Sequence, residues 1–302
     1  MTPARTPLTR DDLAPLARAA VGGRRALIGV TRLRGGSKKG VYRLAFDDDT
    51  TAVAYVWSPD ENYWDPQPAD PGDPFHGAAG LAELTAAHDR LVAAGVRTPR
   101  LLHADATRTH LPADAAVVED MTGGSLEEAM ERYPVAGRAA LERLAEQLAV
   151  LHAHEGPALG KVVLVDGGGT SSAPTCEQRV TEGALRDIEE TVVRDARIAA
   201  AREDLETAVR ELSAAVRPRA RHTLIHGELG PDHVLLDAGG KPALDEDRLR
   251  LYRLAMRLSL VAGPLRLLDG DFPDPEFMRE IAEHNLRRAL ELAGRGDLAS
   301  AT

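Results

Sequence analysis

The chain has 302 residues, enough for one large domain or two coupled domains that each bury a hydrophobic core. Hydrophobic residues make up 43% of the chain and charged residues 28%, a globular composition that excludes wholesale disorder. The net charge of −10 would repel a polyanion, so nucleic acid is not expected as a partner.

The cysteine content and the chain ends indicate the compartment. Cys176 is the only cysteine, so it cannot form an intrachain disulfide or complete a zinc site by itself. Residues 1–15 lack the apolar run of a secretory signal, and the most apolar late stretch, Leu258–Leu268, contains Pro264 and Arg266. We therefore expect a cytoplasmic protein that does not associate with membranes.

The N-terminal part of the chain changes from helical to strand periodicity. Thr9, followed by acidic residues, predicts the start of a helix that reaches about Gly22. Short β-prone segments separated by turn residues then predict an antiparallel meander over Ala26–Leu33, Val41–Phe46 and Thr51–Trp57. Residues 66–80 are rich in Pro, Gly and Asp and predict a loop.

Helical periodicity dominates the later part of the chain. A helix is expected over Leu81–Ala94, and short strands are expected around Leu101 and over Ala115–Val118. Further helices are expected from Ser125 and over Ala139–His152, Thr181–Val216, Asp245–Gly263 and Pro275–Gly294.

This order of elements predicts an α+β protein with two lobes. Residues 1–118 would form a β-rich lobe, residues 119–125 a hinge, and residues 126–302 a helical lobe. Within the last of these, VVLVD at 162–166 reads as a strand, followed by a loop that could line an acceptor pocket.

The stretch Thr223–Asp237, TLIHGELGPDHVLLD, is the strongest candidate for chemistry. A short apolar strand leads into His226 and Glu228, and His233 precedes a second apolar strand. A carboxylate on such a loop, with a ligand-type side chain five positions later, suits a general base beside a metal-bound phosphate. Taken one at a time, these residues would be better explained as an exposed loop acid and structural histidines.

This stretch resembles the HGDxxxxN signature of the aminoglycoside phosphotransferase and choline kinase family, small-molecule relatives of the protein kinases. The resemblance implies that Glu228 stands where the family has the Asp that accepts or orients the proton of the substrate hydroxyl. It implies that His233 stands where the family has the Asn that binds magnesium. Both residues depart from the family pattern.

The glycine-rich segment Arg34–Leu44, RGGSKKGVYRL, resembles the loop that the family folds over the nucleotide phosphates. Flexible glycines, backbone amides and cationic side chains suit anionic oxygens. The candidate phosphate-binding residues are Gly35, Gly36, Ser37, Lys38, Lys39 and Gly40.

Other motifs of the family follow in the expected order, and the resemblance covers roughly residues 35–260. Glu83 lies on a segment that matches the helix whose Glu pairs with a strand lysine. Glu119 and Met121 lie in a segment similar to the hinge, whose backbone groups would contact the purine. Leu144–His152 resembles a characteristic helix that ends in Leu-His.

The strand expected to carry the phosphate-pairing lysine reads TAVAYVW and has Tyr55 in the lysine position. A phenol is neutral at pH 7 and cannot replace a cation. Lys38 or Lys39 could supply the charge from the loop, or both could form the solvated tip of a hairpin. Since the standard base is also replaced, the chain could instead be a catalytically inactive, nucleotide-binding relative.

The family also has a magnesium-bridging Asp after a strand, in a pattern like P-A-L-I-D-x-E. Here Asp245 follows Pro242, Ala243 and Leu244 directly and also looks like the acidic first turn of a helix. Either Asp245 is the metal ligand, or a segment that holds the ligand is missing between Leu244 and Asp245.

The resemblance thus implies a two-lobed, protein-kinase-like fold and transfer of the γ-phosphoryl group of ATP or GTP, with Mg²⁺, to a hydroxyl of a small molecule. The acceptor would be an antibiotic, as for resistance enzymes, or a metabolite such as an amino alcohol or sugar. Glu119, Asp120 and the acidic loop 65–73 would suit a cationic acceptor, or would be only solvated surface.

Overall fold

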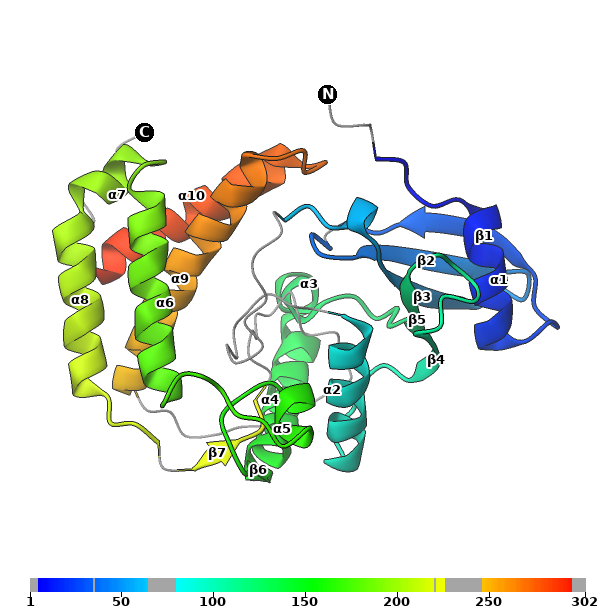
Figure 1. The fold of residues 1–302 in the computed structure, drawn as a ribbon, viewed down its shortest axis with the longest axis horizontal. Helices are drawn as coiled ribbons and strands as arrows, with labels where there is room; N and C mark the ends of the chain where they lie inside the picture. The colour runs from blue at the N-terminus through cyan, green and yellow to red at the C-terminus, as the bar shows by residue number, and fades with distance from the viewer. Residues whose placement is uncertain (1–4, 35, 65–79, 220, 226–245, 295–302) are drawn as a thin grey trace. The chain divides into compact units, whose positions relative to one another are not determined.

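The structure is a computed structural model that describes residues 5–34, 36–64, 80–219, 221–225 and 246–294, and side chains within α9 from residue 250 (Figure 1). Its backbone contacts divide the chain into two compact units. The described part of the sheet unit comprises residues 5–34, 36–62, 80–170 and 222–225. The described part of the helical unit comprises residues 63–64, 171–219, 221 and 246–294. The three predicted segments, 1–118, 119–125 and 126–302, are a different division and stay a prediction.

A five-stranded antiparallel sheet is the centre of the sheet unit, with strand order β1-β2-β3-β5-β4. The predicted meander forms β1, β2 and β3, and β5 pairs with β3 so that β4 lies at the edge. The strands span Leu27–Arg32 (β1), Gly40–Phe46 (β2), Thr51–Trp57 (β3), Leu101–Asp105 (β4) and Asp114–Glu119 (β5).

Alternate side chains of a strand point to opposite faces of the sheet, so one face of this sheet is apolar. The helix α1 (Arg10–Val21) packs on that face. Thr9 and Asp12 form a capping box that fixes the start of α1, as the sequence predicts. The core between α1 and the sheet is formed by fully buried side chains, including Leu13, Leu16, Tyr42, Leu44, Phe46, Ala54 and Val117. The opposite face of the sheet is therefore left for other contacts.

After β3 the chain forms η1 (Pro59–Glu61), a short 3-10 helix. The other helices of the sheet unit are α2 (Leu81–Ala93), α3 (Leu126–Arg132), α4 (Pro134–Ala153) and α5 (Val162–Asp166). Two-residue strands β6 (Glu155–Gly156) and β7 (His222–Thr223) pair just beyond the end of α4.

The strand predicted at VVLVD is wrong, because these residues form α5. The helix is closed by hydrogen bonds from the Val165 amide to the Lys161 carbonyl (3.0 Å) and from the Gly167 amide to the Val163 carbonyl (3.3 Å). It packs against α2, so tertiary contact overrides the β-propensity of its valines.

The helical unit contains α6 (Cys176–Thr191), α7 (Ala196–Ala200), α8 (Arg202–Ala215), α9 (Glu246–Leu268) and α10 (Pro275–Leu292). Where the periodicity predicts one or two helices over Thr181–Val216, the chain forms three. Caps mark the starts of the first two: Thr175 accepts a hydrogen bond from the Gln178 amide at the start of α6, and Asp195 accepts one from the Arg197 amide at the start of α7. A separate apolar core joins these helices, with Ile188, Ile198, Leu205, Leu254, Leu258 and Leu290 fully buried.

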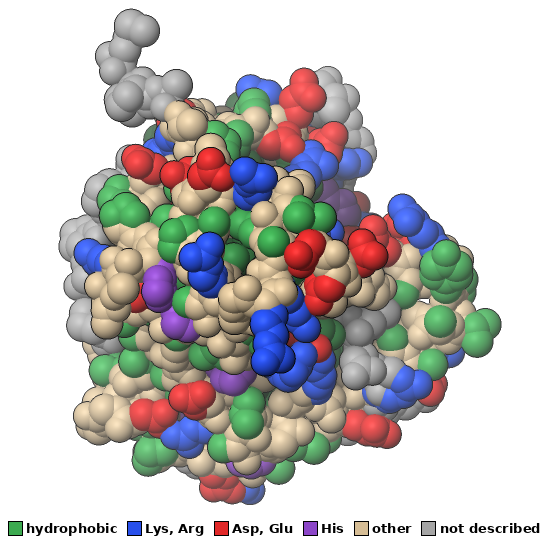
Figure 2. Space-filling view, turned by 90° about the vertical axis from the view of Figure 1, so that its right-hand side faces the viewer, with side chains coloured by type: hydrophobic (Ala, Val, Ile, Leu, Met, Phe, Trp, Pro, Cys, Tyr) green, Lys and Arg blue, Asp and Glu red, His purple; other side chains and the backbone are tan. Residues whose placement is uncertain are grey.

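The α+β class that the sequence predicts is confirmed. Among the helices that the structure describes, none is both long and apolar enough to cross a membrane. Figure 2 shows basic and acidic side chains interspersed on one face of the molecule, so charges of both signs are close neighbours there despite the net charge of −10.

Candidate nucleotide-binding site

The glycine-rich segment forms the connection between β1 and β2, closed by a hydrogen bond from the Leu33 amide to the Val41 carbonyl (2.8 Å). Gly36 has a φ of +73°, and a Cβ atom there would lie 2.6 Å from the Lys39 carbonyl oxygen. Only glycine fits this turn without strain. Gly35 lies outside the described residues.

Gly40 begins β2 directly above a buried carboxylate. A Cβ atom at Gly40 would lie 2.6 Å from the Glu61 Cδ atom. Glu61, which is 5% exposed, accepts hydrogen bonds from the Tyr42 hydroxyl and from the Arg32 guanidinium (2.9 Å). Burial, with the hydrogen bond to Glu61, raises the pKa of Tyr42 to about 12. Sequence reasoning missed Glu61, although a glycine inside a strand signals a close approach of another group.

Lys39 and Tyr55 meet on the sheet face opposite α1. The Lys39 Nζ atom lies 5.0 Å from the centre of the Tyr55 ring, within the range of a cation–π contact. Tyr55 faces Val41 across the β2–β3 ladder and makes an edge contact with Trp57 at 6.2 Å between ring centres. Burial lowers the pKa of Lys39 and raises the pKa of Tyr55. Ser37 and Lys38, which precede Lys39 in the loop, are half-buried.

The acidic residues at the end of β5 are paired with arginines. Asp120, whose side chain is 3% exposed, binds Arg43 through two hydrogen bonds (2.7 and 3.1 Å). Glu119 binds Arg97 (3.1 Å) and accepts a hydrogen bond from the Arg100 amide (3.1 Å). Their charges are therefore compensated within the sheet unit and do not form an open acidic cleft.

The predicted hinge residues lie where β5 ends. The Glu119 amide donates to the Arg100 carbonyl (2.9 Å), so it is engaged within the sheet unit. The Met121 sulfur accepts a weak hydrogen bond from Arg97 (3.7 Å). The contact of this segment with a purine stays a prediction.

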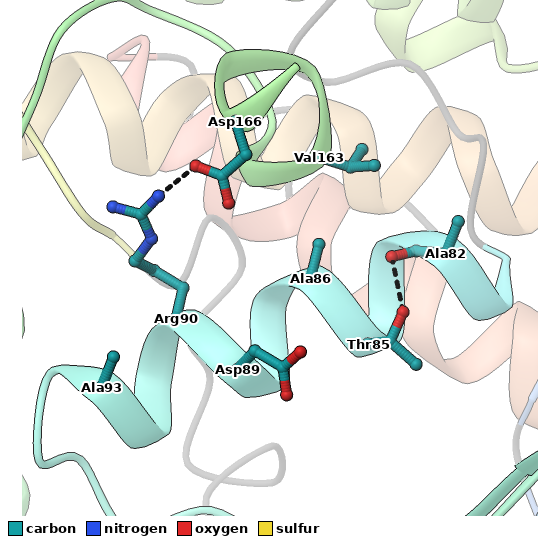
Figure 3. Close-up of a pocket in the computed structure, with 8 residues that line it drawn as sticks. All are labelled: Ala82, Thr85, Ala86, Asp89, Arg90, Ala93, Val163 and Asp166. Carbon is teal, nitrogen blue, oxygen red and sulfur yellow. Dashed lines mark hydrogen bonds and ion pairs between the residues drawn. The ribbon is translucent and has the colours of Figure 1, made fainter. Parts of the chain in front are cut away.

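Glu83 lies in the first turn of α2, and the sequence motifs predict a helix at this position. Among the described residues, no ion pair joins Glu83 to Lys39. Other residues of α2, from Ala82 to Ala93, line an open depression of about 700 Å³ against α5, where Arg90 forms an ion pair with Asp166 (Figure 3). None of the predicted site residues lines this depression.

The candidate catalytic residues Glu228, His233 and Asp245 lie outside the described residues. The described chain enters their segment from β7, where the Leu224 amide donates to the His154 carbonyl (2.9 Å), and leaves it at α9. Within the described ranges, no group of three or more His, Cys, Asp and Glu side chains could hold a metal ion. The predicted metal ligands are therefore not tested by this geometry.

Two solved structures are similar to the whole chain. One is a candidate aminoglycoside phosphotransferase from Ralstonia eutropha, with 14% identity and a TM-score of 0.48, covering 96% of this chain and 97% of that one. The other is a candidate fructosamine-3-kinase from Thermobifida fusca, with 16% identity and a TM-score of 0.40, covering 94% and 97%. No curated protein sequence matches the chain.

A family model provides the assignment. The model of the phosphotransferase enzyme family matches residues 48–286, which include β3, α2, the β5 end and the candidate catalytic segment. The resemblance that the sequence motifs predict is thereby confirmed. The chain belongs to the phosphotransferase enzyme family.

Proposed function

We propose that the protein transfers the γ-phosphoryl group of ATP or GTP to a hydroxyl group of a small molecule in the cytoplasm. The observation that carries the proposal is the glycine turn between β1 and β2, where a side chain at Gly36 would collide with the Lys39 carbonyl. A backbone without side chains can approach phosphate oxygens closely, and the adjacent lysines supply positive charge. In a phosphotransferase, this is the chemistry needed to hold a nucleotide.

In this proposal Glu228 orients the acceptor hydroxyl and accepts its proton as the phosphoryl group is transferred. Mg²⁺, with His233 and Asp245 as its proposed protein ligands, would neutralise phosphate charge when bound. Glu is one methylene longer than the Asp of the family signature, so the acceptor is expected to lie slightly farther from the loop backbone.

For the acceptor we propose an antibiotic or a metabolite such as an amino alcohol or sugar. Recognition of a cationic acceptor is not expected to depend on Glu119 or Asp120, because arginines already pair with both. The acidic loop 65–73 remains the proposed source of negative charge.

A second candidate function is a catalytically inactive protein that binds nucleotide for regulation. Tyr55 in the lysine position of β3 and Glu228 in the base position favour it. Both functions require nucleotide binding. They differ in turnover, because only the enzyme consumes the nucleotide.

The test is a nucleotide-consumption screen with ATP or GTP and Mg²⁺ against a panel of antibiotics and metabolites, with mass spectrometry of the products. Glu228→Gln should reduce transfer by about a hundredfold to ten-thousandfold while nucleotide affinity is unchanged, because the amide retains the shape but cannot accept the proton. Glu203→Gln, at an exposed position of α8, is the matched control and should retain full activity.

Half or more of the original activity in Glu228→Gln would remove this residue from the base position. Nucleotide binding without turnover across the panel would favour the inactive protein, and absence of nucleotide binding would contradict both functions.

A further inference from the structure

The Lys39 ammonium lies on the sheet face opposite α1, at the point where β2 begins. Lys39 is one residue before β2, and the alternation of the strand puts it on the same face as Val41 and Arg43. Its ammonium lies over the ring of Tyr55, 5.0 Å from the ring centre. The lysine therefore lies beside the side chain that replaces the expected strand lysine.

No carboxylate neutralises this ammonium within the part of the chain that the structure describes. Asp120, whose charge acts on Tyr55, is bound by Arg43 through two hydrogen bonds. Glu61 lies beneath Gly40 and is bound by Arg32 and Tyr42. Both acids are thus already paired with other groups.

The surroundings of Lys39 also reduce its hydration. Burial lowers its pKa, which means that the charged form is less well solvated than in water. A partly desolvated ammonium without a counter-ion gains more from an anionic ligand than a fully hydrated one does. The aromatic ring holds the cation in one place without neutralising it, since a cation–π contact leaves the charge available.

We propose that Lys39, positioned on the ring of Tyr55, is the residue that binds the nucleotide phosphates in place of a strand lysine. This inference rests on the proposed function and makes it more specific: the cation has moved from β3 to the residue before β2, and Tyr55 has become its support.

The test measures binding of MgATP and of adenosine by isothermal titration calorimetry, at low and high salt. Lys39→Ala should weaken MgATP binding by about tenfold to a hundredfold, because one charge-assisted contact is lost. It should also reduce the salt dependence and leave adenosine affinity unchanged, because adenosine has no phosphate. Lys39→Arg should retain most of the affinity, and Lys38→Ala should weaken MgATP binding less than Lys39→Ala does. Arg24→Ala, at an exposed position outside the loop, is the control that should bind both ligands as the original protein does.

Variants of Tyr55 test the support and the relocation. Tyr55→Phe keeps the ring and should bind MgATP normally, whereas Tyr55→Leu should weaken binding without changing adenosine affinity. The double variant Lys39→Ala with Tyr55→Lys returns the cation to β3 and should recover much of the lost MgATP affinity.

Unchanged MgATP binding in Lys39→Ala, or an equal loss in Lys38→Ala, would overturn the assignment while leaving the proposed function intact. An equal loss of adenosine affinity would show a purely structural effect and would also overturn it. If the original protein binds no MgATP, the proposed function fails, and this inference fails with it.

Discussion

The absence of a side chain at Gly40 allows a buried carboxylate to lie beneath the glycine-rich loop. A Cβ atom there would be 2.6 Å from the Glu61 Cδ atom and 2.7 Å from the Tyr42 Cε2 atom. Neither neighbour can move freely, because Glu61 is held by Arg32 and the Tyr42 hydroxyl accepts a hydrogen bond from the Leu8 amide (3.1 Å). Gly40 thus joins the loop to the polar network beneath it.

Gly40→Ala is accordingly expected to lower the free energy of unfolding by about 1–3 kcal/mol, the usual range for overpacking a filled site. Urea denaturation followed by circular dichroism measures this. Gly23→Ala is the matched control, because nothing lies within 4 Å of the added Cβ atom. Equal stability of the two variants would mean that the Glu61 and Tyr42 side chains can shift to accommodate the added Cβ atom, and would contradict the prediction.

At the residue scale, the sequence indicates the glycines and lysines of the loop but not their partners. Gly36 and Gly40 stand out in the sequence as residues that a phosphate loop needs, and in the structure an added Cβ atom at either position would collide with its neighbours. The pairing of Arg43 with Asp120 and of Gly40 with Glu61 joins residues distant in the sequence. No local pattern encodes such contacts, because they arise from strand pairing and burial.

Among the elements, β4 and β5 are joined at one end by the carboxylate of Glu119. It accepts hydrogen bonds from the Arg100 amide and from the Arg97 guanidinium (3.1 Å each). The hydrogen bond from the Arg100 amide, together with the arginine charges, lowers the pKa of Glu119. A lowered pKa means that the ionised side chain stabilises the fold above its ordinary pKa and that this contribution is lost as the pH falls through the folded value.

Glu119→Gln should therefore reduce the stability at neutral pH by about 1 kcal/mol, since a charge-assisted hydrogen bond is weakened at a partly exposed site. Below the native pKa of Glu119, the original protein is protonated there too, and the difference should disappear. Thermal unfolding from pH 7 down to pH 3 gives the comparison, with Glu142→Gln on the exposed side of α4 as control. A constant difference at every pH would contradict the ionic contribution.

Helix and strand positions were predictable wherever a local signal marks them. Thr9 caps α1 as expected, and Thr51–Trp57 forms β3 with the predicted bounds. The cap at Thr175, which starts α6 before the predicted Thr181–Val216 segment, and the cap at Asp195, which divides that segment, are both visible in the sequence. The helical state of VVLVD could not be read locally, because packing against α2 decides it.

For the whole molecule, pH dependence near neutrality is expected to come from Asp187 on α6. Burial raises its pKa to about 6, although the nearby Arg266 acts in the opposite direction. A raised pKa means that the protonated form is favoured in the fold. The associated stability is fully present below the ordinary pKa of about 4 and is lost as the pH rises through about 6.

Asp187→Asn is expected to raise stability at pH 8 by on the order of 1 kcal/mol after allowance for solvent screening, and to flatten the stability profile between pH 4 and pH 8. Thermal melts across this range measure both effects. Glu189→Gln is the control: it removes a charge at an exposed position of the same helix, so the slope of stability against pH should not change. A slope that survives in Asp187→Asn would assign the titration to another group.

The division of the chain into two units has a consequence for its synthesis. The sheet unit takes residues on both sides of α6, α7 and α8, because β6 is paired with β7, which follows those helices in the chain. During synthesis on the ribosome, β6 therefore cannot pair with β7 until the three helices between them have emerged. Domains that are continuous in sequence can fold one after another from the N-terminus. This chain cannot complete its first unit before it has begun the second, and a truncation after residue 170 would leave β6 without the strand it pairs with.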